Sequence, residues 1–169
     1  MAYKGLREPH VLLIGNPVKL VRNLAGVLTP AQLRRIRSAV DNEAKLLYQL
    51  GVEHYQFALS LDARHWRQKV SRFYYGAYNA KRAVSLCHDG SFATDSSDHG
   101  RIDQLPDGFV NAATYAVKLK ALREDRNLAD YSHFATEADL VVPLSEVIEL
   151  VGGFLDQVRK FLIGKGVSL

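Results

Sequence analysis

The sequence contains a single cysteine, Cys87, among its 169 residues. One cysteine excludes a disulfide within the chain and any zinc site built from several thiolates. No apolar run reaches the roughly 20 residues that a membrane-spanning helix needs. The apolar stretch Val11–Gly15 is too short for the core of a signal peptide. We therefore expect a cytoplasmic protein without a membrane segment.

Several motifs of known chemistry are also missing. The sequence has no GxxxxGK[ST] phosphate loop, no GxGxxG loop, no HExxH metal motif and no GxSxG nucleophile motif. Its six histidines are scattered, and none has another three or four residues away. His88 and His99, which flank a long polar segment, form the one pair worth checking for a metal. We expect no metal and no cofactor, and we expect Cys87 to be a core residue.

The composition is that of an ordinary globular domain, with 47% apolar and 24% charged residues. Lysine and arginine outnumber aspartate and glutamate by 22 to 18, which gives a net charge of +4. This excess mildly favours a polyanionic partner such as RNA.

Helical patterns begin only at Thr29, so residues 1–28 are predicted to form an irregular arm. Within it, Val11–Ile14 should be extended and Gly15–Pro17 should form a turn. The arm is expected to pack on the domain or on a second subunit. Residues 29–169 are predicted to form one helical domain.

The rest of the sequence favours an all-α, up-and-down bundle of four to five helices. Thr29 begins a capping box with proline at the next position, and Gly51 is expected to interrupt or bend the helix that follows. Asp62 is expected to cap a second helix that runs to about Cys87, and residues 88–104 read as a loop. A third helix should begin near Pro106 or Asp107. A final helix follows a capping pattern at Thr136–Asp139 and either kinks or begins in regular form at Pro143.

One stretch carries residue types suited to phosphodiester chemistry. Arg126 and His133 are seven positions apart, so on a continuous helix they would lie on one face, about 10.5 Å apart along the axis. A permanently charged guanidinium suits a phosphate, and an imidazole suits proton transfer near neutral pH. The alternative is structural: Arg126 and Asp130 form an ion pair across one helical turn, and His133 lies beyond the helix end.

The segment Arg126-Asn-Leu-Ala-Asp-Tyr-Ser-His133 resembles the Arg…His motif of HEPN domains, in the Arg-x-x-Ala-Asp-Tyr form. Upstream, the tyrosine- and alanine-rich segment 72–84 is similar to the second helix of that family. The order also agrees: aromatic helix, polar loop with His99, motif helix and long closing helix. The resemblance covers roughly residues 39–162.

The resemblance implies a helical homodimer with two Arg…His motifs facing each other. Active members are metal-independent endoribonucleases, often toxins or defence factors encoded beside a nucleotidyltransferase partner. Arg126 would then neutralise the phosphorane, His133 would act as general base or acid, and Asn127 would orient the histidine or the phosphate. The candidate substrate-binding residues are Asp130, Tyr131, Arg123 and His99.

Two other interpretations remain open. In the first, the chain is a non-catalytic HEPN module that binds nucleotides or RNA. In the second, it is a structural helical partner subunit. Phe134 and Ala135 follow His133, so the His-x-Tyr extension of AMP-accepting toxins is absent and tyrosine modification is not expected. Tyr74, Tyr75 and Tyr78 are expected to lie mainly in the core, with one hydroxyl reaching the site.

Overall fold

The computed structural model describes residues 16–92 and 96–169. These residues form five α-helices and no strand, which confirms the predicted all-α class. Three short 3-10 helices lie between them. The α-helices are α2 (Pro17–Asn23), α3 (Pro30–Ser60), α4 (Trp66–Asp89), α5 (Ala112–Tyr131) and α6 (Leu144–Gly164), and the 3-10 helices are η1 (Ala63–His65), η2 (Ser96–Arg101) and η3 (Glu137–Asp139).

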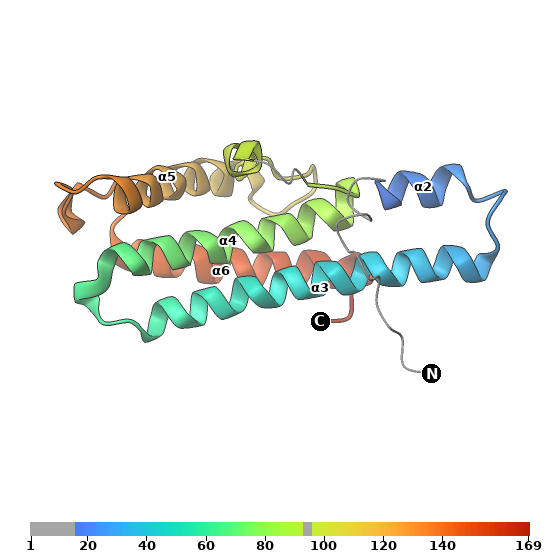
Figure 1. Cartoon of the computed structure of the whole chain (residues 1–169), viewed down its shortest axis with the longest axis horizontal. Coiled ribbons are helices and arrows are strands. Elements are labelled where there is room, and N and C mark those ends of the chain that lie inside the picture. Colours follow the sequence, from blue (N-terminus) through green and yellow to red (C-terminus); the bar gives the residue numbers. More distant parts are fainter. Residues whose placement is uncertain (1–15, 93–95) are drawn as a thin grey trace.

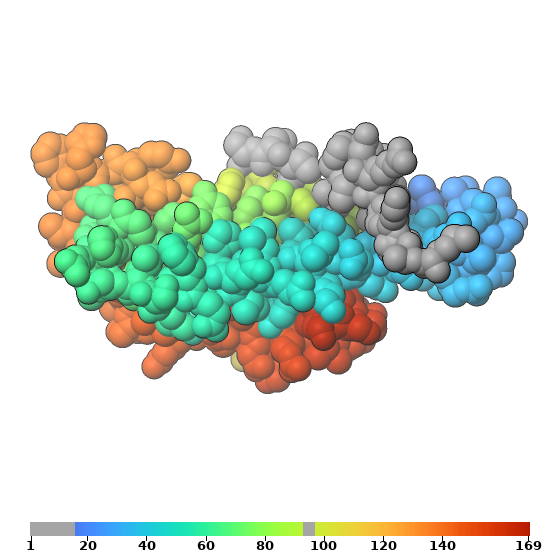
Figure 2. Space-filling view, turned by 60° about the horizontal axis from the view of Figure 1, so that its bottom comes forward, coloured from blue at the N-terminus to red at the C-terminus, as the bar shows by residue number. Residues whose placement is uncertain are grey.

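Helix α4 lies at the centre of the bundle. It runs beside α3, while α6 packs on both of them and α5 covers another side of α4 (Figure 1). Fully buried rings fill the space between the helices, among them Phe73 and Tyr74 on α4 and Phe154 on α6. Figure 2 shows α3 along much of one face of the molecule, with α6 beneath it. None of the described helices is long and apolar enough to cross a membrane.

Helices α3 and α4 pack closely where two glycines meet. A Cβ atom on Gly51 would lie 2.7 Å from the carbonyl oxygen of Gly76, and one on Gly76 would lie 3.1 Å from the carbonyl oxygen of Gly51. The expectation that Gly51 interrupts its helix is therefore wrong, because α3 continues through it. The glycine instead lets two backbones touch, an advantage that offsets its poor helix propensity.

The prediction that residues 1–28 lack helical order is also wrong, because Pro17–Asn23 form α2. Asn16 caps this helix: its side chain accepts a hydrogen bond from the Lys19 amide and donates one to the carbonyl of Asp89 at 2.9 Å. Proline at the first helical position needs no partner for its nitrogen. The predicted extended segment Val11–Ile14 lies outside the described residues.

Several other helix boundaries differ from the expected ones. Asp62 caps η1 rather than a long helix, and α4 extends through His88 to Asp89. The polar segment contains η2, and α5 begins at Ala112 instead of near Pro106. Thr136 caps only η3. Of the two alternatives for Pro143, the structure has the second: it directly precedes α6, so the helix is not kinked there.

Candidate functional site

Arg126 projects from α5 towards α4, and its guanidinium is held on three sides. Its Nη2 donates a hydrogen bond to the Tyr75 hydroxyl at 2.8 Å, and its Nη1 donates one to Asn127 Oδ1 at 3.2 Å. Its Nε lies 2.8 Å from Asp130 Oδ2, which confirms the ion pair expected across one helical turn. Its Nε faces Asp130 without a hydrogen bond. Arginine has five N–H groups, so one N–H on each Nη nitrogen has no partner among the described residues. The side chain is 14% exposed.

Aromatic rings surround this guanidinium. Its central carbon lies 5.6 Å from the ring centre of Tyr74 and 5.5 Å from those of Tyr75 and Tyr131. Tyr74 and Tyr78 are buried, as expected for residues at core spacing. The hydroxyls of Tyr74, Tyr75 and Tyr78 bind His99, Arg126 and Asp98, respectively. A cation among rings is favoured by the ring quadrupoles.

His99, on η2, belongs to the same cluster. Its Nδ1 lies 2.7 Å from the Tyr74 hydroxyl, and its ring stacks on Tyr78 with centres 4.4 Å apart. Burial lowers the pKa of His99, and the positive charge of Arg126 lowers it further, against the opposing effect of Asp98. The lowered pKa favours the neutral form of this imidazole. Arg123, another candidate residue, has its guanidinium next to Gly100 and is paired with Glu124.

Arg126 keeps its positive charge at neutral pH. Burial lowers the pKa of this guanidinium, but Tyr75 and Asp130 outweigh burial and raise the pKa above its ordinary value. Asp98 stabilises the other end of the cluster, since its carboxylate accepts a hydrogen bond from Tyr78 at 2.7 Å and pairs with Arg82 at 3.0 Å. The cluster thus holds the Arg126 cation and the His99 imidazole against the ring of Tyr74.

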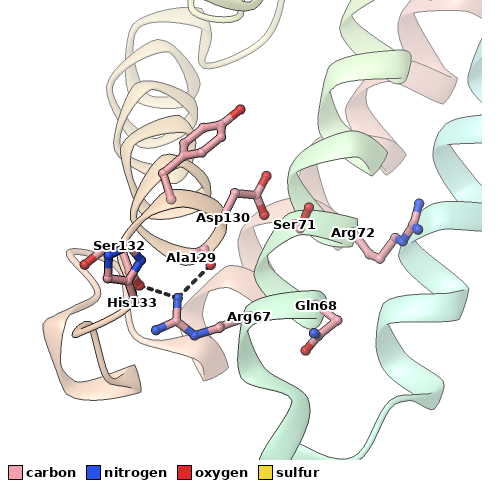
Figure 3. Close-up of a pocket in the computed structure, with 9 residues that line it drawn as sticks. Arg67, Gln68, Ser71, Arg72, Ala129, Asp130, Ser132 and His133 are labelled. Atoms are coloured by element: carbon pink, nitrogen blue, oxygen red, sulfur yellow. Dashed lines mark hydrogen bonds between the residues drawn. The ribbon is translucent and has the colours of Figure 1, made fainter.

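His133 does not lie on the same helix face as Arg126, because α5 ends at Tyr131. Of the two interpretations of the motif, the structure therefore has the one in which Arg126 pairs with Asp130 and His133 lies beyond the helix end, and not the continuous helix. Arg67, on α4, donates hydrogen bonds to the carbonyl oxygens of Ala129 at 2.8 Å and Ser132 at 2.7 Å (Figure 3). It donates a third to the carbonyl of Ala135 at 2.6 Å. These contacts hold the chain in a turn and leave the His133 side chain exposed.

His133 instead lines a pocket of about 430 Å³ between the end of α5 and the start of α4. Figure 3 shows Asp130 pointing from α5 towards α4 in this region, while Arg72 extends towards α3. Asp130 also pairs with Arg126, so it links the pocket to the aromatic cluster. The described lining is rich in donors and consists of Arg67, Gln68, Ser71, Arg72, Ala129, Asp130, Tyr131, Ser132 and His133.

No protein-family model, no curated protein and no solved structure matches this chain. Its site is therefore interpreted from its own geometry. Over the residues described, no group of three or more histidine, cysteine or acidic side chains is placed to hold a metal ion. His88 pairs with Asp89 and packs near Phe161, whereas His99 packs against the tyrosines.

The sequence interpretation missed several residues that build the site. Tyr74 and Tyr75 are predicted as core residues with one hydroxyl reaching the site, but the sequence does not indicate that their hydroxyls bind His99 and Arg126. Arg67 carried no recognisable signal, since its partners are carbonyl groups more than 60 residues away. Arg72 contacts His54 of α3, with 3.5 Å between Nη1 and Nδ1.

Proposed function

We propose that this protein is a metal-independent endoribonuclease that resembles HEPN enzymes and cuts RNA through attack by the 2′-hydroxyl. The observation that supports this most directly is that Arg126 and His99 both contact the ring of Tyr74. A guanidinium with two N–H groups left for oxygen ligands suits a phosphate. A neutral imidazole beside it supplies a further donor or a proton acceptor.

The contact with Tyr74 gives His99 a specific role in this proposal. Burial raises the pKa of the Tyr74 phenol well above its usual value, so the hydroxyl keeps its proton. Because Tyr74 is fully buried and His99 is the partner of its hydroxyl among the described residues, we assign the phenol as the donor and Nδ1 as the acceptor. The proton of the neutral imidazole then lies on Nε2, which can donate to a phosphate oxygen.

His133 is the proposed general base. It would take the proton from the 2′-hydroxyl, the 2′-oxygen would attack phosphorus, and the bond to the 5′-oxygen would break. The leaving 5′-oxygen takes up a proton from water, His133 returns its proton to the solvent, and a 2′,3′-cyclic phosphate remains. Arg126 neutralises the charge that develops on the phosphorane, and Asn127 holds the guanidinium through its side-chain oxygen. Asp130, Tyr131 and Arg123 are the proposed substrate contacts around it.

A second copy of the chain is part of the proposal. Tyr131, Phe134 and Val141 are 70%, 91% and 69% exposed beside the end of α5. Apolar side chains gathered near a site favour association. A two-fold dimer through this end would bring two Arg126–His133 regions together and enclose the phosphate. A nucleotidyltransferase-type partner, a toxin or defence role and a cytoplasmic location are further parts of the proposal that rest on the resemblance.

The second candidate function is a non-catalytic module that binds nucleotides or RNA. The observation that favours it is the separation of the motif: Arg126 is tied to Asp130 and Tyr75, and His133 lies beyond the end of α5. Such a module would bind the phosphate and would leave the RNA intact.

One experiment separates the two functions. The purified protein is incubated with total RNA in EDTA, beside Arg126→Ala, His133→Ala and His99→Gln, with Arg64→Ala as an exposed arginine control. Cleavage that leaves cyclic phosphate ends is expected from the unchanged protein and from Arg64→Ala. Loss of a general acid or base typically slows a reaction by about 10²–10⁴. Full activity of His133→Ala, or activity that requires magnesium, contradicts the ribonuclease. RNA binding without cleavage supports the module.

A further inference from the structure

Another cavity, of about 410 Å³, lies beside η2 and next to the aromatic cluster. Asp98 lines this cavity, while the next residue, His99, contacts Tyr74 and Tyr78. The cavity and the proposed active site are thus separated by adjacent residues of one short helix. Its described lining is Lys81, Ser85, Asp89, Ser91, Phe92, Asp98, Arg101 and Gln104.

Lys81 is the unusual residue of this cavity. It is 5% exposed, and it makes no hydrogen bond or ion pair within the described part of the chain. Lys69 on the same helix is comparably buried at 7%, but its Nζ donates to the carbonyl of Leu61 at 2.8 Å. Burial lowers the pKa of Lys81, and the charges of Asp98 and Asp89 oppose that effect. Among the described residues, Lys81 Nζ is not a fully buried atom, so its ammonium group reaches the open space of the cavity, where it has no acceptor from the protein.

The neighbouring polar groups of the cavity also lack acceptors. Ser85 lies one turn after Lys81 on α4, is 4% exposed and has no hydrogen-bond partner among the described residues. Arg101 lies at the rim and forms no ion pair within the same residues. The cavity is therefore lined by three hydrogen-bond donors that have no acceptor among the described residues: the Lys81 ammonium, the Ser85 hydroxyl and the Arg101 guanidinium.

The two carboxylates that line the cavity, Asp89 and Asp98, form no hydrogen bond with these donors. Asp98 accepts a hydrogen bond from Tyr78 and pairs with Arg82. Asp89 lies 2.8 Å from Nδ1 of His88. Since both acids are engaged elsewhere, the ligand that completes the cavity must bring its own acceptors. Oxygen atoms of an anion match an ammonium, a guanidinium and a hydroxyl placed together.

We propose that this cavity binds a phosphate group, with Lys81 and Ser85 at its base and Arg101 at its rim. The volume lies within the range of small-molecule sites and exceeds that of a single phosphate, so the group is carried by a larger ester. The larger molecule is either a free nucleotide or an RNA strand. In the second case the scissile phosphate lies on Arg126 and the next phosphate of the strand lies in the cavity. The strand source rests on the proposed function, whereas the phosphate site itself does not.

The test is calorimetric titration of the full chain with inorganic phosphate and with 5′-AMP at constant ionic strength. Lys81→Met keeps the length of the side chain and removes its charge. Loss of a hydrogen bond between charged partners weakens binding by about tenfold or more, so Lys81→Met is expected to show at least that loss. Lys69→Met, a buried lysine outside the cavity, and Lys120→Met, an exposed one, are expected to bind as the unchanged protein does.

Arg101→Gln provides a second variant that does not depend on tolerance of a change in the core, because Arg101 is exposed. It is expected to weaken phosphate binding to a smaller extent. No binding of either probe to the unchanged protein, or equal binding to Lys81→Met and Lys120→Met, overturns the site.

A non-cleavable deoxyribose oligonucleotide distinguishes the two sources of the phosphate. If Lys81→Met weakens binding of the oligonucleotide together with that of 5′-AMP, the strand occupies the cavity. If only 5′-AMP is affected, a free nucleotide does. The outcome does not depend on cleavage: a failed RNA cleavage assay leaves the result for phosphate binding unchanged.

Discussion

The Tyr74 hydroxyl lies 2.7 Å from Nδ1 of His99, and the ring of the same tyrosine lies 5.6 Å from the guanidinium carbon of Arg126. One buried phenol therefore contacts both the candidate cation and the candidate imidazole. It fixes the orientation of His99 through its hydroxyl and supports Arg126 through its ring. This arrangement makes the protonation of His99 sensitive to the charge of Arg126.

We predict that His99 titrates below the ordinary histidine value of about 6.5 and that Arg126→Gln raises its pKa. Burial and the Arg126 charge lower this pKa, Arg82 acts in the same direction, and Asp98 opposes them. Proton NMR of the imidazole signals as a function of pH measures the shift. Arg64→Gln removes a distant exposed charge and should leave the His99 titration unchanged; an equal effect of both variants contradicts the proposed proximity.

The same shift has a consequence for stability. In the unfolded chain His99 binds a proton at a higher pH than in the folded protein. Stability contributed by the neutral imidazole is therefore present above about pH 6.5 and is lost as the pH falls towards the lower folded pKa.

We predict that Arg67→Met destabilises the protein by about 2–3 kcal/mol, because hydrogen bonds from a charged donor to three carbonyl groups are lost. Urea unfolding measures the change, and hydrogen exchange should show faster opening around residues 132–135. Arg64→Met makes the same chemical change at an exposed position on η1 and should cost little. Equal stability of the two variants contradicts the role given to Arg67.

Arg67 also explains why the sequence leaves two positions open for His133. The local sequence after Tyr131 contains no glycine or proline to end a helix until Pro143, so it cannot decide between a continuous helix and a helix that ends before His133. The end is set by a side chain from α4, more than 60 residues upstream. A helix terminus that depends on such a tertiary contact leaves no signal in its own sequence.

Other features were predictable, and some signals were misread. The capping box at Thr29 and the apolar spacing of α6 are local patterns, and both elements are found as expected. Asn16 followed by Pro17 is a helix start, but Gly15-Asn16-Pro17 is also a typical turn sequence, and the prediction follows the turn. The polar partners of Tyr74 and Tyr75 were unpredictable, since spacing identifies a buried face and not the hydrogen bonds that buried hydroxyls make.

We predict that Gly51→Ala destabilises the bundle by about 1–3 kcal/mol, because the added Cβ atom would lie 2.7 Å from a backbone oxygen that cannot move alone. Thermal and urea unfolding measure the effect. Gly164→Ala is the matched control, since no atom lies within 4 Å of its added Cβ and alanine favours a helix. If both alanine variants are equally stable, α3 and α4 do not meet at this glycine contact.

The last prediction concerns the dimer. Phe134→Ser, at a position 91% exposed, should shift the protein from dimer to monomer in light scattering, because it removes apolar surface next to the proposed two-fold axis. Surface-exposed Val27→Ser, at the distant α2–α3 connection, should not change the molecular mass.

Mixing two inactive variants tests whether the dimer shares its active site. If each site takes Arg126 from one subunit and His133 from the other, a heterodimer of Arg126→Ala and His133→Ala contains one intact site and one doubly altered site. Random exchange makes half of the dimers mixed, so activity should return to about a quarter of that of the unchanged protein. If each site lies within one subunit, every site in the mixture carries one substitution and no activity returns. A dimer without complementation therefore excludes the shared site while leaving the dimer itself in place.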